Sequence, residues 1–393
     1  MSIETTSMSF EDIRPLNNLE VRDAIEDLLS SESFRRRIPY VYKTQTWEDF
    51  AAAMRACKTK EEFKSTLSYN AVMAIAKATT FSLTISGRSR LSKDMRPCTF
   101  ISNHRDIVCD AAFLNTTLFD VGYGMTQVAI GDNLLIRPWI KTLVRLNNSF
   151  IVKRNIPVRQ LKEASEVLSN YIHHTIKETK ESIWIAQREG RSKDSDDKTQ
   201  TAVLKMFVMG GSNEDVLSNL IDLNIVPVAI SYEIDPCDYL KAMEFQLKRD
   251  NPDYTKSALD DLKNMETGLL GYKGRVHFTI AGSISEELEA LKEKELKRAE
   301  LYLAVANVID NAIYKHYRFY PRNYVAYDML TRTKRFSTNY GSKEKAEFEG
   351  YLQAQLDKID IPNKDNAFLL QKMLEMYSNP LINHLSSQAT TID

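Results

Sequence analysis

CTFISNHRDIVCD, residues 98–110, is the stretch of sequence that decides how this chain folds. It opens with a short run of mostly apolar and β-branched residues, which is typical of a buried strand. A polar turn, Asn-His-Arg-Asp, comes next, and an apolar segment of helical character runs from Ile107 to about Leu118. The pattern predicts a strand, a turn and a helix, with His104 at the tip of the turn.

His104 and the two carboxylates that follow it, Asp106 and Asp110, are the candidate catalytic residues. A carboxylate that accepts a hydrogen bond from an imidazole fixes the tautomer of the ring and stabilises the imidazolium ion. Such a pair can take a proton from a hydroxyl group. Because a histidine with an aspartate nearby in sequence is common, the pair alone does not identify an active site.

Composition and charge exclude several classes of protein. The chain has 393 residues, of which 43% are hydrophobic and 27% are charged, as in a globular protein with a full core. Lys and Arg (52) balance Asp and Glu (53), so we do not expect a nucleic-acid-binding protein. No apolar signal segment opens the chain, and no stretch reaches the ~18 uninterrupted apolar residues of a membrane span. We therefore expect a cytoplasmic protein.

The cysteines and the remaining histidines have the patterns of structural residues. His173 and His174 lie in a helical segment with charged neighbours and are expected at the surface, whereas His277 alternates within a strand and is expected to pack. The cysteines are scattered, with no Cys-x-x-Cys pair, so we expect reduced thiols and no metal site. They are Cys57, Cys98, Cys109 and Cys237.

The first of three expected regions is helical. Apolar residues recur at helical spacing from residue 18 to about 78, and Thr46 is the expected cap of one of these helices. The region either completes the core as a helical cap or presents residues 71–85 to a membrane interface. The expected divisions are a helical N-terminal region, 1–80, an α/β domain, 81–285, and a helical C-terminal region, 286–393.

The middle region alternates short apolar runs with amphipathic segments. This alternation predicts an α/β fold with a mostly parallel sheet flanked by helices. Residues 190–200 are expected to be a loop-like insertion. Strands are expected at 82–87, 98–102, 125–130, 148–152, 182–186, 224–231 and 276–280, and helical segments at 158–176 and 202–223.

The C-terminal region is rich in Glu, Lys, Leu and Ala. We expect one long helix from Glu286 to about Phe319, which Pro321 ends. Two shorter helices, near 343–358 and 365–377, are expected before a polar tail.

Four polar blocks occur in a fixed order along the chain, and this order resembles the glycerolipid acyltransferase superfamily, the glycerol-3-phosphate and 1-acylglycerol-3-phosphate O-acyltransferases. In that family the blocks run His-x4-Asp, Phe-Ile-x-Arg, Glu-Gly-x-Arg-Ser and Val-Pro-Val. The resemblance covers roughly residues 80–285. The blocks here are Asn103-His104-Arg105 with Asp106 and Asp110, then Asn148 to Arg154, then Arg188-Glu189-Gly190-Arg191-Ser192, then Ile225 to Tyr232.

The resemblance implies an O-acyltransferase of phospholipid biosynthesis. It would transfer a fatty acyl group from acyl-CoA or acyl-carrier protein to 1-acyl-sn-glycerol 3-phosphate, with His104 as general base and no cofactor or metal. Glycerol 3-phosphate or another lysolipid is the alternative acceptor, and an inactive lipid-binding homologue is the alternative class. A lipid substrate implies peripheral association with the inner face of the membrane.

The later blocks supply the expected substrate contacts. A phosphate needs cations, and Lys153, Arg154 and Arg191 can provide them. Glu189 and Gly190 follow a strand, where open α/β sheets bind ligands. Pro227 interrupts a strand and suggests an edge, a bulge or a pocket wall. The expected substrate-binding residues are Arg105, Lys153, Arg154, Glu189, Gly190, Arg191, Ser192 and Pro227.

The chain departs from the family pattern at two places. Cys109 stands where the family has the carboxylate, and the acids stand at Asp106 and Asp110. We expect Asp106 to cap a helix that begins at Ile107, and Asp110 to reach His104 through a one-residue bulge in the first turn. Asp106 as the partner is the alternative. Gln187-Arg188 also replaces the family's Phe-Pro, which leaves the acceptor open.

Overall fold

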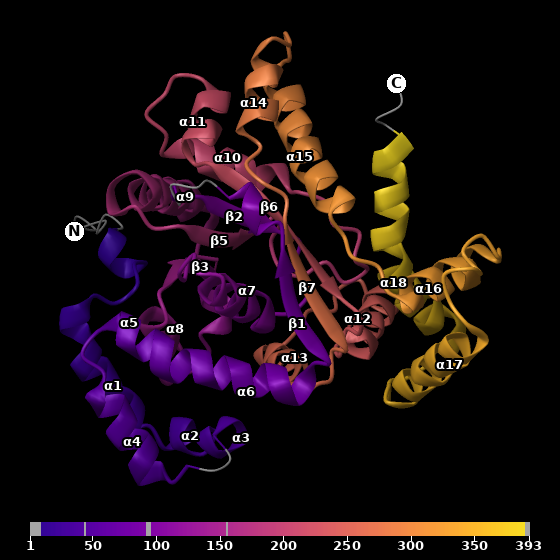
Figure 1. Cartoon of the computed structure of the whole chain (residues 1–393), viewed down its shortest axis with the longest axis horizontal. Helices are drawn as coiled ribbons and strands as arrows, with labels where there is room; N and C mark the ends of the chain where they lie inside the picture. The colour runs from indigo at the N-terminus through magenta and orange to yellow at the C-terminus, as the bar shows by residue number, and fades with distance from the viewer. Residues whose placement is uncertain (1–8, 43–44, 92–95, 155, 390–393) are drawn as a thin grey trace.

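Across the described residues, 9–42, 45–91, 96–154 and 156–389, the computed structural model contains one sheet of seven strands in the order β1-β7-β6-β2-β5-β3-β4 (Figure 1). The strands from β6 to β4 run parallel, whereas β7 is antiparallel to β6 and pairs in parallel with β1. The strands are β1 Ser82–Ser86, β2 Thr99–Ser102, β3 Gln127–Gly131, β4 Ser149–Val152, β5 Ile183–Ala186, β6 Ile225–Tyr232 and β7 Arg275–Ile280. The predicted α/β fold with a mostly parallel sheet is confirmed.

Helices cover both faces of the sheet (Figure 1). Successive residues of β2 show why, because Phe100 belongs to the apolar core on one face and Ile101 to the core on the other. The Phe100 side packs against α6 Tyr69–Thr79 and α7 Cys109–Asp120. The Ile101 side packs against α9 Val158–His174, α10 Thr201–Met209, α11 Val216–Asp222, α14 Ser285–Lys292 and α15 Arg298–Lys315.

The N-terminal helices form an apolar cluster of their own. Val21, Ile25 and Leu28 pack against Phe50, and α8 Pro138–Leu146 closes the cluster. Thr46 caps α4 as expected, because its Oγ1 accepts a hydrogen bond from Asp49 N at 3.1 Å. The helices are α1 Val21–Ser30, α2 Glu32–Arg35, α3 Ile38–Val41, α4 Trp47–Ala56 and α5 Lys60–Glu62, with a π-helical turn at Phe63–Ser68 before α6.

The C-terminal region differs from the sequence prediction. The long helix expected from Glu286 to Phe319 is two helices, α14 and α15, with a break between Lys292 and Arg298. Pro321 begins a helix instead of ending one, because proline suits the first helical position, where no N–H is needed. The helices that follow are α16 Pro321–Thr331, α17 Ser342–Asp357 and α18 Asn366–Ala389, the last with Pro380 inside it.

Two smaller expectations are also corrected. His173 is buried rather than exposed, and its Nε2 lies 2.8 Å from the carbonyl of Phe207. Residues 190–200 lie in a loop, as predicted, but the loop already begins at Gln187 and lies against the core, with Asp197 fully buried. α14 and α15 share the core of the sheet, whereas α16, α17 and α18 form a further apolar cluster with α12 Asp238–Asp250. None of the described helices is long and apolar enough to cross a membrane.

Candidate active site

His104 lies just beyond β2, a central strand, in the loop that leads into α7. Asn103 anchors the start of this loop to β6. Its side-chain Nδ2 donates to Ile230 O at 2.9 Å, and its Oδ1 accepts from Ile230 N at 2.8 Å. This paired contact continues the sheet by one residue and holds His104 at the carboxyl ends of the parallel strands, where α/β folds place ligands.

The imidazole of His104 contacts the carboxylate of Asp110. Nδ1 lies 2.8 Å from Asp110 Oδ2, and the Asp110 side chain is fully buried. The same oxygen accepts hydrogen bonds from the backbone N–H groups of Arg105, at 2.6 Å, and Asp106, at 3.0 Å. The carboxylate therefore assigns the ring proton to Nδ1 and leaves Nε2 as the basic nitrogen.

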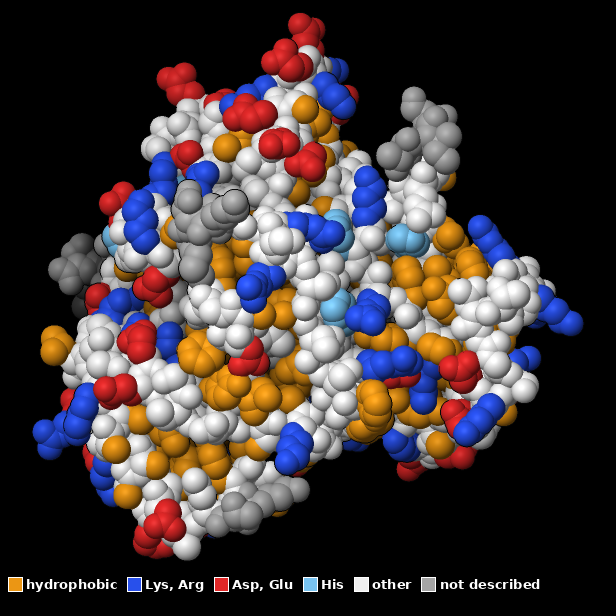
Figure 2. Space-filling view, in the orientation of Figure 1, with side chains coloured by type: hydrophobic (Ala, Val, Ile, Leu, Met, Phe, Trp, Pro, Cys, Tyr) orange, Lys and Arg blue, Asp and Glu red, His pale blue; other side chains and the backbone are white. Residues whose placement is uncertain are grey.

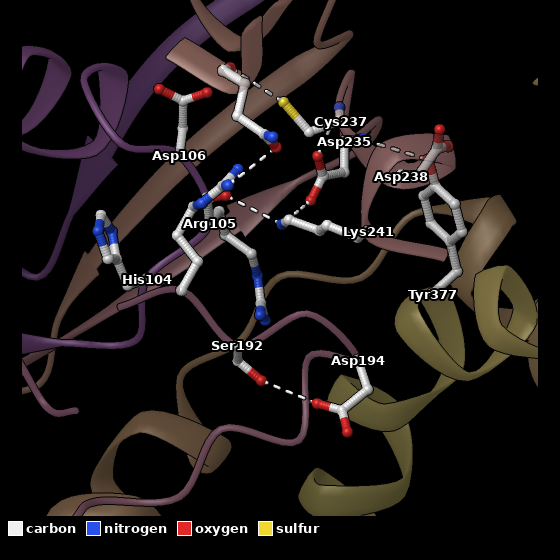
Figure 3. A network of polar contacts seen from close by, with 12 residues as sticks. His104, Arg105, Asp106, Ser192, Asp194, Asp235, Cys237, Asp238, Lys241 and Tyr377 are labelled. Carbon is white, nitrogen blue, oxygen red and sulfur yellow. Dashed lines mark hydrogen bonds and ion pairs between the residues drawn. The ribbon is translucent and has the colours of Figure 1, made fainter. Parts of the chain in front are cut away.

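Asp106 has a different task. Its Oδ1 accepts from the backbone N–H groups of Val108, at 2.9 Å, and Cys109, at 2.7 Å, and thereby closes the turn that leads into α7, whose N-cap is Val108. α7 begins at Cys109 rather than at the expected Ile107. Residues 107 and 108 form a turn before the helix. This turn, rather than the expected bulge in the first helical turn, connects His104 to Asp110. In Figure 3 no hydrogen bond joins the side chains of Asp106 and His104.

The orientation of the His104 ring is also determined by an aromatic contact. The ring packs edge-to-face against Trp184 of β5, with ring centroids 5.6 Å apart. Trp184 is held in turn, because its Nε1 donates to Ser102 Oγ at 3.0 Å. About an eighth of the His104 side chain is exposed, 13%, so the ring still reaches the surface.

Arg105, expected to bind substrate, forms a buried ion pair within the protein. Its guanidinium forms a two-pronged ion pair with Asp197, at 2.9 and 2.5 Å, and both side chains are buried. The backbone carbonyl of Arg105 accepts from Lys241 Nζ at 3.0 Å, and Lys241 pairs with Asp235 (Figure 3). Because the guanidinium is already paired with a buried carboxylate, we interpret Arg105 as a residue that supports the His104 loop.

The second and third polar blocks meet at the carboxyl ends of β4 and β5, which β3 separates in the sheet. Arg154 follows β4, and its Nη1 lies 3.6 Å from Oε1 of Glu189, which follows β5 and is largely exposed. The backbone N–H of Arg154 donates to Asp132 Oδ1 at 3.0 Å. Lys153, next to Arg154, is half-buried. Two cations and one carboxylate therefore lie along the same edge of the sheet as His104.

Gly190 and Arg191 follow in the loop 187–200. Gly190 has a φ of +67°, in the left-handed region that favours glycine, and no atom lies within 4 Å of an added Cβ. Arg191 is buried, and its Nη2 donates to Asn264 Oδ1 at 2.9 Å. Its Nη1 is buried and has no hydrogen-bond partner among the described residues. A buried guanidinium nitrogen with an unused donor is suited to an anion.

Ser192, the last residue of the third block, is engaged within its own loop. Its Oγ donates to Asp194 Oδ1 at 3.0 Å and lies 3.2 Å from Asp196 O (Figure 3). Because the side chain is fully buried by these contacts, the geometry indicates that Ser192 shapes the loop.

Pro227 lies in β6, at the centre of the sheet and not at an edge. Its carbonyl accepts from Ala281 N at 2.9 Å, whereas the antiparallel ladder with β7 begins at the next residue, Val228. Proline has no N–H with which to donate in return across this pair, and the assigned ladder accordingly begins one residue later. The buried ring is part of the sheet framework.

Cys109, the residue at the family's carboxylate position, is an inert thiol. Burial raises the pKa of Cys109 well above its ordinary value, and the nearby Asp106 carboxylate raises it further. A thiol that stays protonated is a poor nucleophile. Among the described residues, no group of three or more His, Cys, Asp or Glu side chains is placed to hold a metal ion.

Sequence reasoning missed the residues that support the His104 loop from a distance. Asp197 lies in the expected loop-like insertion, Lys241 lies in α12, the helix after β6, and Tyr317 follows α15. The Tyr317 hydroxyl donates to Asp197. Asp196-Asp197 and Asp235-Pro236-Cys237-Asp238 are acidic segments after strands β5 and β6, and that placement is the signal that could have found them.

Comparison with known proteins finds no similar sequence and only a remote structural similarity. No protein-family model matches it, and no curated protein sequence matches it significantly. Among solved structures, the chain is similar to the crystal structure of the 1-acyl-sn-glycerophosphate (LPA) acyltransferase PlsC from Thermotoga maritima. The identity is 15%, the alignment covers 75% of this chain and 95% of that chain, and the TM-score is 0.33. Similarity this low does not establish a family.

Proposed function

We propose that this protein is an O-acyltransferase that esterifies 1-acyl-sn-glycerol 3-phosphate from an acyl thioester. The observation that supports it most is the 2.8 Å contact between His104 Nδ1 and the buried Asp110 carboxylate, in a turn at the carboxyl end of a central strand. The four polar blocks of the sequence support the same reaction class.

The proposed reaction needs one general base and no covalent intermediate. His104 Nε2 takes the proton of the acceptor hydroxyl as the oxygen attacks the thioester carbonyl. Asp110 stabilises the imidazolium that forms. When the tetrahedral intermediate collapses, the carbon–sulfur bond breaks, and the imidazolium returns the proton to the leaving thiolate. The products are the new ester and the free thiol of CoA or acyl-carrier protein.

The acceptor is assigned from the cations near His104. Arg154, Lys153 and the unused Nη1 of Arg191 supply positive charge for a phosphate. Glycerol 3-phosphate and other lysolipids carry similar groups, so they remain the competing acceptors. We expect replacement of Arg191 by Gln to raise the acceptor KM while the thioester KM changes much less, because a phosphate contact serves the acceptor alone.

The deciding experiment measures thioester turnover by the purified protein with each acceptor and with both acyl-CoA and acyl-carrier protein. We expect His104→Ala to lower turnover on the order of 10²–10⁴-fold. Asp110→Asn is expected to be nearly as damaging, and Asp106→Asn mild, because the amide oxygen of Asn can accept from the same two backbone N–H groups. Lipid binding without turnover by the unaltered protein would instead indicate an inactive lipid-binding homologue.

Peripheral membrane association is part of the proposal, because the acceptor lipid resides in a bilayer. Figure 2 shows apolar side chains gathered on the face that α6 crosses. Exposed residues on and beside α6 and α13 Ala258–Leu270 include Phe81 (77%), Tyr272 (53%) and Leu270 (45%). We expect carbonate or high salt to release the protein from membranes. Release by detergent alone would contradict this part of the proposal.

A further inference from the structure

The two oxygens of the Asp110 carboxylate have unequal surroundings. Oδ2 receives three donors, His104 Nδ1 and the backbone N–H groups of Arg105 and Asp106. Oδ1 is buried and makes no hydrogen bond with any described residue. Buried carboxylate oxygens normally have a donor, so Oδ1 marks a place where a donor is required.

A buried donor without an acceptor lies beside it. Tyr232 is the last residue of β6, and its hydroxyl is buried with no hydrogen-bond partner of ordinary geometry in the described part of the chain. Burial raises the pKa of Tyr232 well above its usual value, and the closeness of the Asp110 carboxylate raises it further. Tyr232 shares an apolar core with Cys109 and Ala111, the residues on either side of Asp110, so the unused donor and the unused acceptor lie in the same part of the protein.

We propose that Tyr232 is a positioning residue, whose hydroxyl donates to Asp110 Oδ1 and thereby holds Oδ2 against His104. The inference rests on the proposed acyl transfer for its kinetic meaning. A turn of the carboxylate about its Cβ–Cγ bond would move both oxygens, so a second contact on Oδ1 adds a further restraint against that turn. The imidazole then keeps its proton on Nδ1 and its free Nε2 toward the acceptor.

Two other polar groups near Tyr232 have partners of their own. Asp106 Oδ1 accepts from the backbone N–H groups of Val108 and Cys109, and the Cys109 thiol lies 3.9 Å from the carbonyl of Gly268. The ring of Tyr232 packs in the apolar core with Val228 and Ile230, where a phenylalanine ring would pack equally well. The hydroxyl is thus the feature that packing does not explain, because burying it costs free energy unless it is paired.

Tyr232→Phe tests the proposal, with Tyr171→Phe as the matched control. Tyr171 is also a buried tyrosine; its hydroxyl donates to Gln127 Oε1 at 2.6 Å, outside the His104 loop. We expect Tyr232→Phe to lower kcat on the order of 10-fold, the effect of one hydrogen bond to a charged group, with both KM values unchanged. Tyr171→Phe should leave kcat unchanged.

A double variant shows whether Tyr232 acts through Asp110. In the Asp110→Asn background, Tyr232→Phe should cause no further loss of kcat, because the contact it supports is already altered. An independent, full loss in that background would overturn the proposal. Equal kcat in Tyr232→Phe and the unaltered protein would overturn it as well.

A measurement that needs no turnover separates this inference from the proposed reaction. In protein carrying ¹⁵N-labelled histidine, NMR reports which ring nitrogen of His104 holds the proton, with His104→Ala to assign the signal. We expect the Nδ1–H form in the unaltered protein and a mixture of forms in Tyr232→Phe. If the ring form changes in Tyr232→Phe but the unaltered protein shows no acyl transfer, the proposed reaction is contradicted and the positioning role is not. If the ring form is the same in Tyr232→Phe and in the unaltered protein, the positioning role is contradicted.

Discussion

The two helical ends of the chain meet the sheet at opposite ends of its strands. The N-terminal helices make their polar contacts away from His104: Lys60 Nζ donates to Asn148 Oδ1 at 2.9 Å, just before β4, and the Tyr69 hydroxyl donates to Asp120 Oδ1 at 2.6 Å, at the far end of α7. The first contact therefore lies at the amino end of a parallel strand, and the second lies at the end of α7 that is farther from His104.

The C-terminal helices instead bind the loop 187–200, beside the site. From α15, Asp310 Oδ1 accepts from Thr199 N at 2.8 Å, and the Tyr314 hydroxyl donates to Asp197 O at 2.6 Å. From α18, Asn379 Nδ2 donates to Asp194 O at 2.8 Å. Each of these contacts crosses more than a hundred residues of sequence, and each is at least partly buried.

The difference teaches that a helical extension affects a site according to where its polar contacts end. Apolar packing at the far end of a sheet stabilises the whole fold without orienting any one side chain. A buried hydrogen bond is directional and determines the position of the group that it reaches. We therefore expect changes in the C-terminal contacts to alter kinetics, and changes in the N-terminal cluster to alter stability alone.

The largest effect is expected from Asp197→Ala. Asp197 joins Arg105, in the His104 loop, to Tyr317, beyond α15. The substitution leaves a buried guanidinium without its counter-ion, which typically costs about 3–5 kcal/mol in the free energy of unfolding. Thermal unfolding should show this loss, and the fraction that remains folded should have a lower kcat.

A paired variant separates the two effects of Asp197. In Arg105→Met with Asp197→Leu, both buried charges are removed, so much of the lost stability should return. Activity should stay low, because Tyr317 no longer connects the C-terminal helices to the loop. Full recovery of kcat together with stability would contradict the kinetic role of the C-terminal contacts.

Leu28→Ala, in the N-terminal cluster, is expected to be nearly as destabilising without altering the site. Leu28 is fully buried among Val21, Ile25 and Phe50, and its truncation should cost about 2–5 kcal/mol. Below the unfolding temperature, kcat and both KM values should equal those of the unaltered protein. A lowered kcat in the folded protein would show that the N-terminal cluster does reach the site.

The sheet could be predicted from the sequence because its signals are local. Each strand is a short apolar run between polar turns, and all seven strands lie within a few residues of their predicted positions. The C-terminal helices were predicted less well. Pro321 can end one helix or begin the next, and only the position of Tyr320, which precedes it as the helix cap, determines which occurs.

In the candidate site, too, contacts between residues close in sequence could be predicted, and contacts between distant residues could not. The contact of His104 with Asp110 could be predicted, because six residues and one turn separate them. Asp197 and Tyr317 lie 92 and 120 residues from their partners, and no periodicity along the chain reports such a distance. The catalytic and substrate-binding roles of the four blocks stay predictions.

A third prediction concerns pH and the C-terminal contact at Asp310. Burial raises the pKa of Asp310 to about 7, although the Thr199 donors oppose this shift and the charges of Asp197 and Asp196 add to it. Between the ordinary pKa of a carboxyl group and about 7, the folded state holds a proton that the unfolded state releases. Stability should therefore fall as pH rises from about 4 to 7.

Asp310→Asn tests the origin of this pH dependence. The amide is neutral at every pH, and its oxygen can still accept from Thr199, so the variant should lose part of the fall in stability. At pH ~8 it should be more stable than the unaltered protein, on the order of 1–2 kcal/mol. Unfolding by urea between pH ~5 and ~8 measures the difference. Identical pH profiles would place the titration elsewhere.

The smallest effects are expected from a matched pair, Asn379→Ala and Thr46→Ala. Asn379→Ala removes the hydrogen bond from Asn379 Nδ2 to Asp194 O, at 2.8 Å. Thr46→Ala removes the cap, in which Thr46 Oγ1 accepts from Asp49 N at 3.1 Å, and an exposed hydrogen bond from Oγ1 to Asp49 Oδ2 at 2.8 Å. Either loss should cost about 1 kcal/mol in the free energy of unfolding. The two variants are thus expected to be alike in stability and in their urea midpoints.

Their kinetics should nevertheless differ. Asn379 holds the loop that carries Arg191, so its loss should let that guanidinium move and should raise the acceptor KM several-fold, about what a 1 kcal/mol change gives. Thr46 caps α4, in the N-terminal cluster, and its loss should leave the acceptor KM unchanged. Initial rates at varied acceptor concentration measure this directly. If both variants changed the acceptor KM alike, the two helical ends would not differ in their connection to the site, because a general loosening of the fold would then explain both.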